Sequence, residues 1–420
     1  MEEQIIIPPN NEYLELNFVG ETATGKGNNT TFIMEAMPDG TFKVTDGRVG
    51  ITIGRHKPKQ YHLPMEQWNN TYTSKIKRGY LLTKQKKMEQ KTITQAGMSV
   101  NGNNYAPIAD VSVKEIVERL LNYANTVLDT NYTIKVNDIS DEMIAYGTKI
   151  LQELAKDYEK MSVAEFNGKL KTLYAAIPRR MDNLSKCLAQ RKIQFNDIIA
   201  NEQDLFDIML SQIRSANSIT LNNQTILEAK NLIWETVTEK EEEKLKKMLG
   251  SEAKGYLRAW KVQNKSTEKA FQNFCVQEGL TEDNGIHHLF HGSRNENFWS
   301  IVTNGLTVNP SGVVITGKMF GNGTYFAPKA AKSMGYTSRS GSRWANGSQN
   351  SGFLAVYKVA TGKCYDRTSS ESDLNWERLQ QRCPGAHCTW AHAGSSLLND
   401  EVIVYQNQQS TIEYLIEIGF

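Results

Sequence analysis

Three separated blocks in the last third of the chain hold residue types that can act on a sugar and on a flat ring. The blocks read LFHGS, GKMFGNGTYFA and NDEVIVY, at residues 289–293, 317–327 and 399–405. They supply, in this order, His291, Tyr325 and Glu401. A phenol ring can stack on a flat group, and a carboxylate can support positive charge on a sugar or take a proton from a hydroxyl. Short motifs recur by chance, whereas three ordered blocks indicate one site.

These blocks resemble the catalytic domain of the poly(ADP-ribose) polymerase family, whose members split NAD+ and transfer ADP-ribose. The chemistry of that reaction accounts for the residue types. Nicotinamide leaves from a carbon bound to a cationic ring nitrogen, so no strong general acid is required. The site must instead hold the dinucleotide, clamp the leaving ring and stabilise an oxocarbenium-like ribose. NAD+ is therefore the expected substrate, and no metal is required.

The resemblance implies which residues hold the nicotinamide end of NAD+. The backbone of Gly292 would meet the carboxamide, at a position where a Cβ would obstruct. The hydroxyl of Ser333 would add a second contact to the same carboxamide. Tyr325 and Tyr336 would sandwich the ring, since flat surfaces stack favourably.

The resemblance also implies contacts with the two riboses. His291 would hydrogen-bond the adenosine ribose, and Asn297 falls near the same end of the dinucleotide. Glu401 would bind the 2′-hydroxyl of the nicotinamide ribose and activate the incoming hydroxyl during chain growth. Ser293 and Lys332 lie in the same motifs and complete the expected NAD+-binding set.

Each signature residue alone has a simpler interpretation. A histidine before Gly-Ser is often a loop residue, Tyr325 could pack in a core, and Glu401 could face solvent at a sheet edge. These interpretations do not account for the ordered flanks. The sequence departs from the family pattern at Lys318, where a tyrosine is common, and at Asn322, where a basic residue is common. Both departures leave the preference for acceptors open.

The overall composition sets wider bounds. A chain of 420 residues should form two or three domains. No stretch reaches the roughly 20 apolar residues of a membrane span, and the first residues are acidic where a secretory signal is basic. Five scattered cysteines suggest reduced thiols. We expect an intracellular protein without membrane association, in the nucleus if eukaryotic and in the cytoplasm if bacterial.

The N-terminal region is basic although the net charge is only +2. Residues 40–92 hold twelve Lys or Arg against three acids, within strand-like alternation and with a hairpin signal at Asp39-Gly40. Residues 46–50 (DGRVG) and 77–80 (KRGY) resemble the WGR domain, with Asp46 where that domain has its tryptophan. The resemblance and the charge predict phosphate contacts to DNA from four cations: Arg48, Lys75, Lys77 and Arg78. The alternative is a solvated face of a small β domain.

The middle of the chain has helical periodicity after a polar linker at residues 101–104. Ser112 with Glu115, and Ser162 with Glu165, have the spacing of capping boxes. The segment resembles the regulatory helical domain of the family, most clearly in the LYxxIP ending at residues 173–178. The resemblance implies that this bundle covers the NAD+ site and loosens when DNA is bound.

Cysteine and histidine also cluster before Glu401. The four residues are Cys383, His387, Cys388 and His392. Such residues can hold zinc tetrahedrally, but the spacing fits no standard finger, so no metal site is predicted.

The sequence thus predicts an α+β multidomain protein. A small β-rich WGR-like domain is expected over residues 1–100, an all-α helical bundle over 105–215, and a mixed α/β ADP-ribosyltransferase catalytic domain over 230–420. The expected activity is poly(ADP-ribose) synthesis on protein acceptors, including the protein itself, with stimulation by damaged DNA. Two alternatives stay open: a mono-ADP-ribosyltransferase, and an inactive nucleic-acid-binding scaffold.

Overall fold

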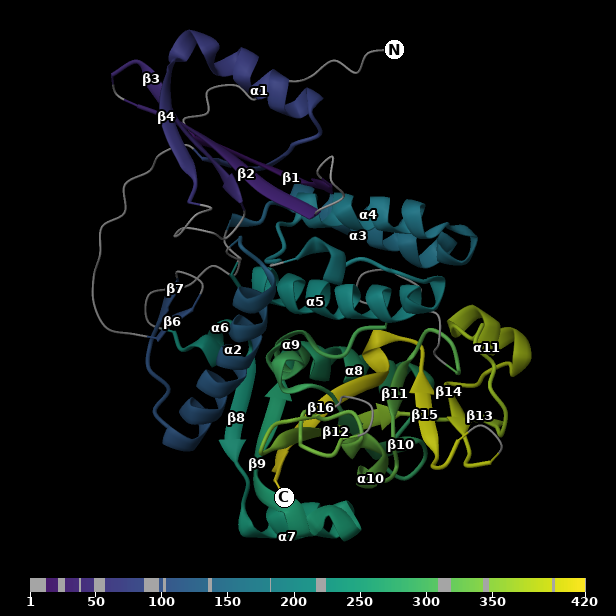
Figure 1. Cartoon of the computed structure of the whole chain (residues 1–420). Helices are drawn as coiled ribbons and strands as arrows, with labels where there is room; N and C mark the ends of the chain where they lie inside the picture. Colours follow the sequence, from purple (N-terminus) through teal and green to yellow (C-terminus); the bar gives the residue numbers. More distant parts are fainter. Residues whose placement is uncertain are drawn as a thin grey trace. The chain divides into compact units, whose positions relative to one another are not determined.

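The computed structural model describes residues 13–21, 27–37, 39–48, 57–86, 98–100, 103–134, 138–181, 183–216, 224–308, 319–342, 347–394 and 397–419. The chain divides into two compact units, and each is described by itself. The first unit holds the described residues up to position 95 together with Leu128–Ile213. The second holds the described residues of Ala96–Val127, Arg214–Pro310 and Val314–Phe420. Figure 1 labels the helices and strands.

An antiparallel sheet forms the N-terminal part of the first unit. Its strands are β1 (Tyr13–Glu21), β2 (Gly27–Ala36), β3 (Thr41–Arg48), β4 (Lys59–Pro64) and β5 (Leu81–Lys86), in the order β4-β3-β2-β1-β5. Alternate residues such as Leu14, Leu16 and Phe32 are buried together with Trp68 and Tyr72 of α1 (Trp68–Lys77). The expected alternation is confirmed in β3, where Phe42 and Val44 are buried, and the hairpin at residues 39–40 joins β2 to β3.

Three longer helices complete the first unit: α3 (Asp141–Asp157), α4 (Val163–Ala176) and α5 (Phe195–Ala216), the last of which runs beyond it. The predicted capping box at the start of α4 is present, because Ser162 and Glu165 exchange hydrogen bonds. Phe166 of α4 stacks on Phe195 of α5 with ring centroids 3.8 Å apart. These contacts fix α4 against α5.

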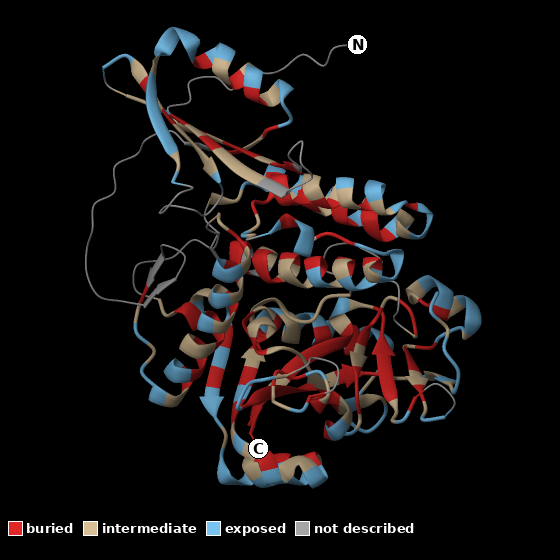
Figure 2. Ribbon diagram, viewed as in Figure 1, coloured by how far each residue is buried: buried red, intermediate tan, exposed pale blue. Residues whose placement is uncertain are grey.

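Two sheets form the second unit. The larger has the order β10-β12-β16-β9-β8 and the smaller the order β11-β15-β14-β13. Their strands are β8 (Leu232–Thr236), β9 (Tyr256–Asn264), β10 (Ile286–Gly292), β11 (Thr324–Phe326), β12 (Gly352–Ala360), β13 (Cys364–Arg367), β14 (Cys388–Ala391), β15 (Glu401–Val404) and β16 (Ser410–Ile418). Figure 2 shows that the central strands of both sheets are almost wholly buried.

Helices of different lengths lie around these sheets. They are α6 (Ile226–Ala229), α7 (Glu239–Leu249), α8 (Lys265–Glu278), α9 (Phe298–Asn304), α10 (Ala330–Met334) and α11 (Trp376–Arg382). A small hairpin of β6 (Met98–Val100) and β7 (Asn103–Tyr105) precedes them in the chain. Part of the expected polar linker, Asn103 and Asn104, is therefore in a strand.

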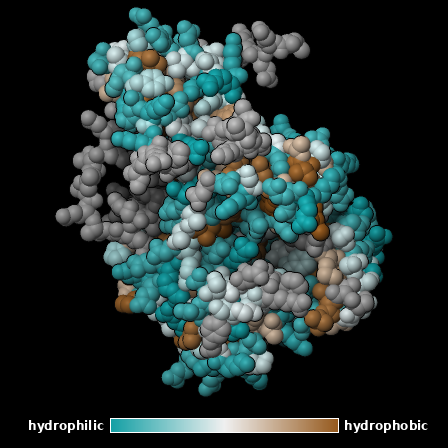
Figure 3. Space-filling model, in the orientation of Figure 1, coloured by the Kyte–Doolittle hydropathy of each residue, from teal (hydrophilic) through white to brown (hydrophobic). Residues whose placement is uncertain are grey.

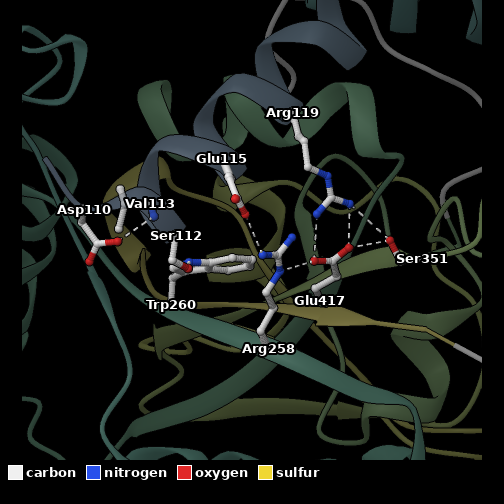
Figure 4. Close-up of polar contacts among 9 residues, drawn as sticks. All are labelled: Asp110, Ser112, Val113, Glu115, Arg119, Arg258, Trp260, Ser351 and Glu417. Carbon is white, nitrogen blue, oxygen red and sulfur yellow. Dashed lines mark hydrogen bonds and ion pairs between the residues drawn. The ribbon is translucent and has the colours of Figure 1, made fainter. Parts of the chain in front are cut away.

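Helix α2 (Val111–Asn131) contributes to the second unit through its first four turns, and the boundary between the units falls after Val127. Its apolar face, including Val113, Ile116 and Leu120, lies in the same core as Trp260 of β9. The capping box predicted at Ser112 is wrong. The helix begins at Val111, Asp110 accepts a hydrogen bond from the Val113 amide, and the Ser112 hydroxyl instead accepts from the Trp260 indole (Figure 4).

A buried carboxylate holds this helix to the sheet. Glu417 of β16, whose side chain is 4% exposed, accepts hydrogen bonds of 2.9 and 2.6 Å from Arg119, 2.8 Å from Arg258 and 2.6 Å from Ser351. Burial acts to raise the pKa of Glu417, but these donors outweigh it and lower the pKa to about 2. Figure 4 shows both guanidinium groups turned toward the carboxylate.

Most of the coloured residues on the face drawn in Figure 3 are hydrophilic. Within the described ranges, no helix combines the length and apolar character needed to cross a membrane.

Candidate active site

The first two signature blocks meet where the two sheets of the second unit touch. The amides and carbonyls of Phe290 and Ala327 exchange two hydrogen bonds of 2.9 Å, which joins the end of β10 to β11. His291 is the next-to-last residue of β10, and its Nδ1 lies 2.9 Å from the carbonyl oxygen of Tyr325. Since a carbonyl only accepts, Nδ1 is the donor in this hydrogen bond.

The third block joins the site because its strand, β15, pairs with β11. Strand β11 runs antiparallel to β15, with Tyr325 opposite Ile403 and Phe326 opposite Val402. Glu401 is the first residue of β15, and only 7% of the residue is exposed. The fold therefore brings His291, Tyr325 and Glu401 to one junction between β10, β11 and β15.

Lys332 of α10 lies against Glu401. Its Nζ is 2.9 Å from Oε1 of the carboxylate, and the two side chains are 13% and 9% exposed. The same ammonium group lies 6.0 Å from the ring centroid of Tyr336. The sequence placed Lys332 in the NAD+-binding set, but nothing in the sequence indicated this ion pair, which depends on how α10 packs beside β15.

Gly292 is required by a close approach of two backbone segments. A Cβ at this position would lie 2.0 Å from the carbonyl oxygen of Ser333 in α10, far inside any real contact. The Ser333 hydroxyl is buried and donates to the carbonyl of Phe290 at 3.2 Å. The end of β10 and helix α10 are thus fixed to each other at the predicted carboxamide position.

The two tyrosines differ in their surroundings. The Tyr325 hydroxyl accepts from the Phe320 amide and donates to the Gly321 carbonyl, both at 3.0 Å, so its ring is held rigidly. Burial raises the pKa of Tyr325 well above its ordinary value. Tyr336 is 39% exposed, so its ring presents surface to solvent. The arrangement leaves one ring fixed and the other accessible.

The remaining predicted residues follow β10. Asn297 donates from Nδ2 to the Ser293 hydroxyl at 2.9 Å, and both residues are half-buried. Of the two departures from the family pattern, Lys318 lies outside the described residues. The backbone amide of Asn322 donates to the Leu374 carbonyl at 2.8 Å.

The two histidines before Glu401 have separate partners. His387 lies between the Lys363 amide at 3.1 Å and Glu278 at 3.2 Å. His392 lies between Asp366 at 2.6 Å and Asp400 at 3.3 Å. In the part of the chain that the structure describes, no three His, Cys, Asp or Glu side chains converge as metal ligands.

Of the four candidate DNA contacts in the first unit, three are exposed and one is buried. Arg48, Lys77 and Arg78 are exposed. The Lys75 side chain is only 9% exposed, its Nζ is 3.1 Å from Asp46, and it lies 3.6 Å from the ring centroid of Phe32. Lys75 therefore does not lie on the surface. Its partner is Asp46, at the position where the resemblance to the WGR domain led us to expect a tryptophan.

Comparisons with known proteins show what the C-terminal part of the chain is similar to. Residues 239–420 match the family described as the poly(ADP-ribose) polymerase catalytic domain. A poly(ADP-ribose) polymerase-like protein, 100L of Invertebrate iridescent virus 6, is 32% identical over 166 residues, which cover 37% of this chain and 82% of that protein. Protein 101L of the same virus is 26% identical over 201 residues, 48% of this chain and 78% of the other. Poly(ADP-ribose) polymerase 2 of Homo sapiens is 41% identical over 178 residues, 34% of this chain and 28% of that protein.

The likeness to the viral polymerase-like protein spans most of that protein, and the family match includes every predicted catalytic residue. The chain therefore belongs to the poly(ADP-ribose) polymerase family and is an NAD+ ADP-ribosyltransferase.

Proposed function

We propose that the protein cleaves NAD+ to nicotinamide and builds poly(ADP-ribose) on protein acceptors, itself included. The bond between nicotinamide and its ribose breaks, and the electron pair leaves with nicotinamide. An acceptor oxygen then bonds to the ribose carbon and gives up its proton. The observation that carries the proposal is the buried Glu401 carboxylate, held at the junction of β10, β11 and β15 beside Lys332.

Glu401 has two roles in this proposal. Its carboxylate binds the 2′-hydroxyl of the nicotinamide ribose and supports positive charge on that sugar as the leaving group departs. During elongation it also takes the proton of the attacking hydroxyl. Lys332 offsets the charge of the carboxylate and holds its orientation, because their atoms lie within 2.9 Å. A held carboxylate has less freedom to lose when the transition state forms.

The other residues hold NAD+. Gly292 and Ser333 receive the nicotinamide carboxamide, and Tyr325 and Tyr336 stack on its ring. His291 hydrogen-bonds the adenosine ribose. The fixed ring of Tyr325 supports this assignment, since a clamp with one rigid wall loses less entropy on binding. Ser293 and Asn297 complete the adenosine side. The proposed chemistry uses no metal.

In this proposal the N-terminal regions regulate the activity of the catalytic domain. A WGR-like domain over residues 1–100 contacts damaged DNA, a helical domain over 105–215 restrains the catalytic domain over 230–420, and DNA relieves the restraint. Exposed Arg48 and Arg78 support the DNA contact. Arg48 of β3 lies opposite Thr30 of β2, and the Thr30 hydroxyl lies 3.1 Å from the Tyr80 hydroxyl. Arg48 and the end of α1 are therefore close together in the first unit.

The test is incubation of the full chain with labelled NAD+, with and without nicked or blunt DNA, followed by gel electrophoresis. A ladder that strengthens with DNA is the expected result. A single shifted band would instead indicate mono-ADP-ribosyl transfer. A ladder that is equal with and without DNA would remove the regulatory part of the proposal and leave the polymerase part standing.

A further inference from the structure

Two cysteines of the second unit face each other across neighbouring strands. Cys364 begins β13 and Cys388 begins β14, and these parallel strands pair with the two cysteines in direct register. The Cys388 thiol donates to the Cys364 sulfur at a distance of 3.3 Å. Both are free thiols in the structure.

The geometry suits a covalent bond between the two sulfurs. Neighbouring strands lie about 4.8 Å apart, which falls within the roughly 4.4–6.8 Å between α-carbons that a disulfide spans. Because the residues are already in register, a small rotation of each side chain brings the sulfurs together. The backbone of the sheet need not move.

The two thiols differ in exposure, which gives each a separate role. Cys364 is half-buried, whereas Cys388 is fully buried. The hydrogen bond from Cys388 lowers the pKa of Cys364 below its ordinary value, and the neighbouring His392 acts in the same direction. A thiolate is the form that attacks an oxidant. Cys364 is therefore the residue that an oxidant meets first, and Cys388 is placed to react with the product.

We propose that Cys364 and Cys388 form an oxidative modification site that reacts with hydroperoxides. The Cys364 thiolate attacks one oxygen of hydrogen peroxide, the O–O bond breaks, and a sulfenic acid and hydroxide form. The Cys388 thiol then attacks the Cys364 sulfur, a disulfide forms, and water leaves. The two thiols are oxidised by two electrons and the peroxide is reduced by two, so that each peroxide yields one disulfide.

The site belongs to the sheet that carries Tyr325 and Glu401. Strand β14 pairs with β15, where Cys388 lies opposite Val404 and Ala391 lies opposite Glu401. A disulfide would tie β13 to β14 and close the segment that contains α11. Formation of the disulfide would also remove the sulfenic acid on Cys364 before that sulfur is oxidised further.

The test uses the full reduced chain, treated with hydrogen peroxide at a small molar excess and then blocked with N-ethylmaleimide. Trypsin releases residues 364–367 as one peptide, because Lys363 precedes and Arg367 ends it. No Lys or Arg follows Arg382, so Cys383 and Cys388 stay on one peptide. The matched variant Cys383→Ser therefore identifies the partner. We expect a linked mass in the intact chain and in this variant, lost on reduction with dithiothreitol.

A second variant keeps the proposal testable if the linked peptide is faint. Cys388→Ser removes the second thiol, so a dimedone probe should label Cys364 about tenfold more than in the intact chain after the same treatment. Equal dimedone labelling in both chains would overturn the proposal. The proposal would also be overturned if both Cys364 and Cys388 carried N-ethylmaleimide after peroxide treatment. The same conclusion would follow if the linked mass were absent from Cys383→Ser. If Cys388→Ser does not fold, the peptide map of Cys383→Ser decides alone.

Discussion

Lys332 and Glu401 form a nearly buried ion pair, with Nζ 2.9 Å from Oε1. The lysine comes from α10 and the glutamate from the first position of β15. A buried pair of this kind is costly to break, because the remaining charge lacks its partner. We therefore interpret the pair as a device that fixes the direction of the carboxylate in the proposed site.

Replacing Glu401 by glutamine should separate binding from elongation. Glu401 is assigned to the ribose and not to the nicotinamide ring, so the affinity for a nicotinamide-mimicking inhibitor should change by less than about 1 kcal/mol. Polymer length should collapse and the transfer rate should fall about 10²–10⁴-fold, because an amide cannot take a proton. Calorimetry and gel analysis with labelled NAD+ measure the two effects. The exposed Glu377→Gln serves as the control and should keep full activity. Long polymer from Glu401→Gln would exclude this residue as the elongation base.

Replacing Gly292 by alanine should damage the proposed carboxamide site. The new Cβ would meet the Ser333 carbonyl at 2.0 Å, so β10 and α10 must separate. Overpacking of this kind costs about 1–3 kcal/mol. We expect a lower melting temperature and weaker binding of nicotinamide-mimicking inhibitors. Gly394→Ala is the matched control, because its Cβ would have no neighbour nearer than 3.6 Å. Unchanged inhibitor binding in Gly292→Ala would show that this approach is not needed for the site.

The meeting of the three blocks could be predicted because ordered motifs identify their residues without any knowledge of packing. The order His291, Tyr325, Glu401 in the chain corresponds to three strands that meet in the fold. The partner of Glu401 could not be predicted, since the Lys332 contact depends on where a five-residue helix packs. Sequence spacing carries no information about that placement.

Two misassigned residues show where local patterns fail. Ser112 fits a capping box, but Asp110 caps the helix and Ser112 bonds to Trp260, a contact across the fold. The basic charge and the resemblance to the WGR domain group Lys75 with surface cations. Its spacing from Trp68 and Tyr72, seven and three residues, is the spacing of one helix face, and this face is buried. Helical periodicity was thus a signal that could have excluded Lys75 from the surface.

Replacing Glu417 by glutamine should loosen α2 from the sheet in a way that depends on pH. The folded pKa of about 2 lies below the ordinary 4.5, so the carboxylate stabilises the fold fully above about pH 4.5. That contribution disappears as pH falls from 4.5 toward 2. The variant should lose about 2–3 kcal/mol near pH 7, allowing for the partial exposure of both arginines. Melting curves should converge with those of the intact chain at low pH. A constant difference across this range would contradict the role of Glu417.

Reversing Lys77 and Arg78 to glutamate should weaken DNA binding if the basic end of α1 contacts phosphates. The effect should be similar for all duplex sequences, and each lost contact should reduce the salt dependence by roughly 0.9 in the log–log slope. Fluorescence anisotropy at two salt concentrations measures this effect. The double reversal Lys265→Glu and Lys269→Glu makes the same charge change on α8 and is the control. Lys75→Glu should instead lower stability, because it places a second carboxylate beside Asp46. Equal DNA affinity for both double variants would mean that the basic run is a solvated face.

Removing the helical region should raise activity without DNA, provided that the deletion spares the first part of α2. The apolar residues Val113, Ile116 and Leu120 belong to the core of the second unit, so a fragment from residue 224 onward loses that packing. A second fragment keeps residues 103–127 and joins them through a Gly-Ser linker to residue 214. We expect it to melt at a higher temperature than the first and to have more basal activity than the intact chain. Labelled NAD+ without DNA provides the measurement, with melting curves to confirm folding. If the second fragment is folded but no more active than the intact chain, the helices do not restrain catalysis.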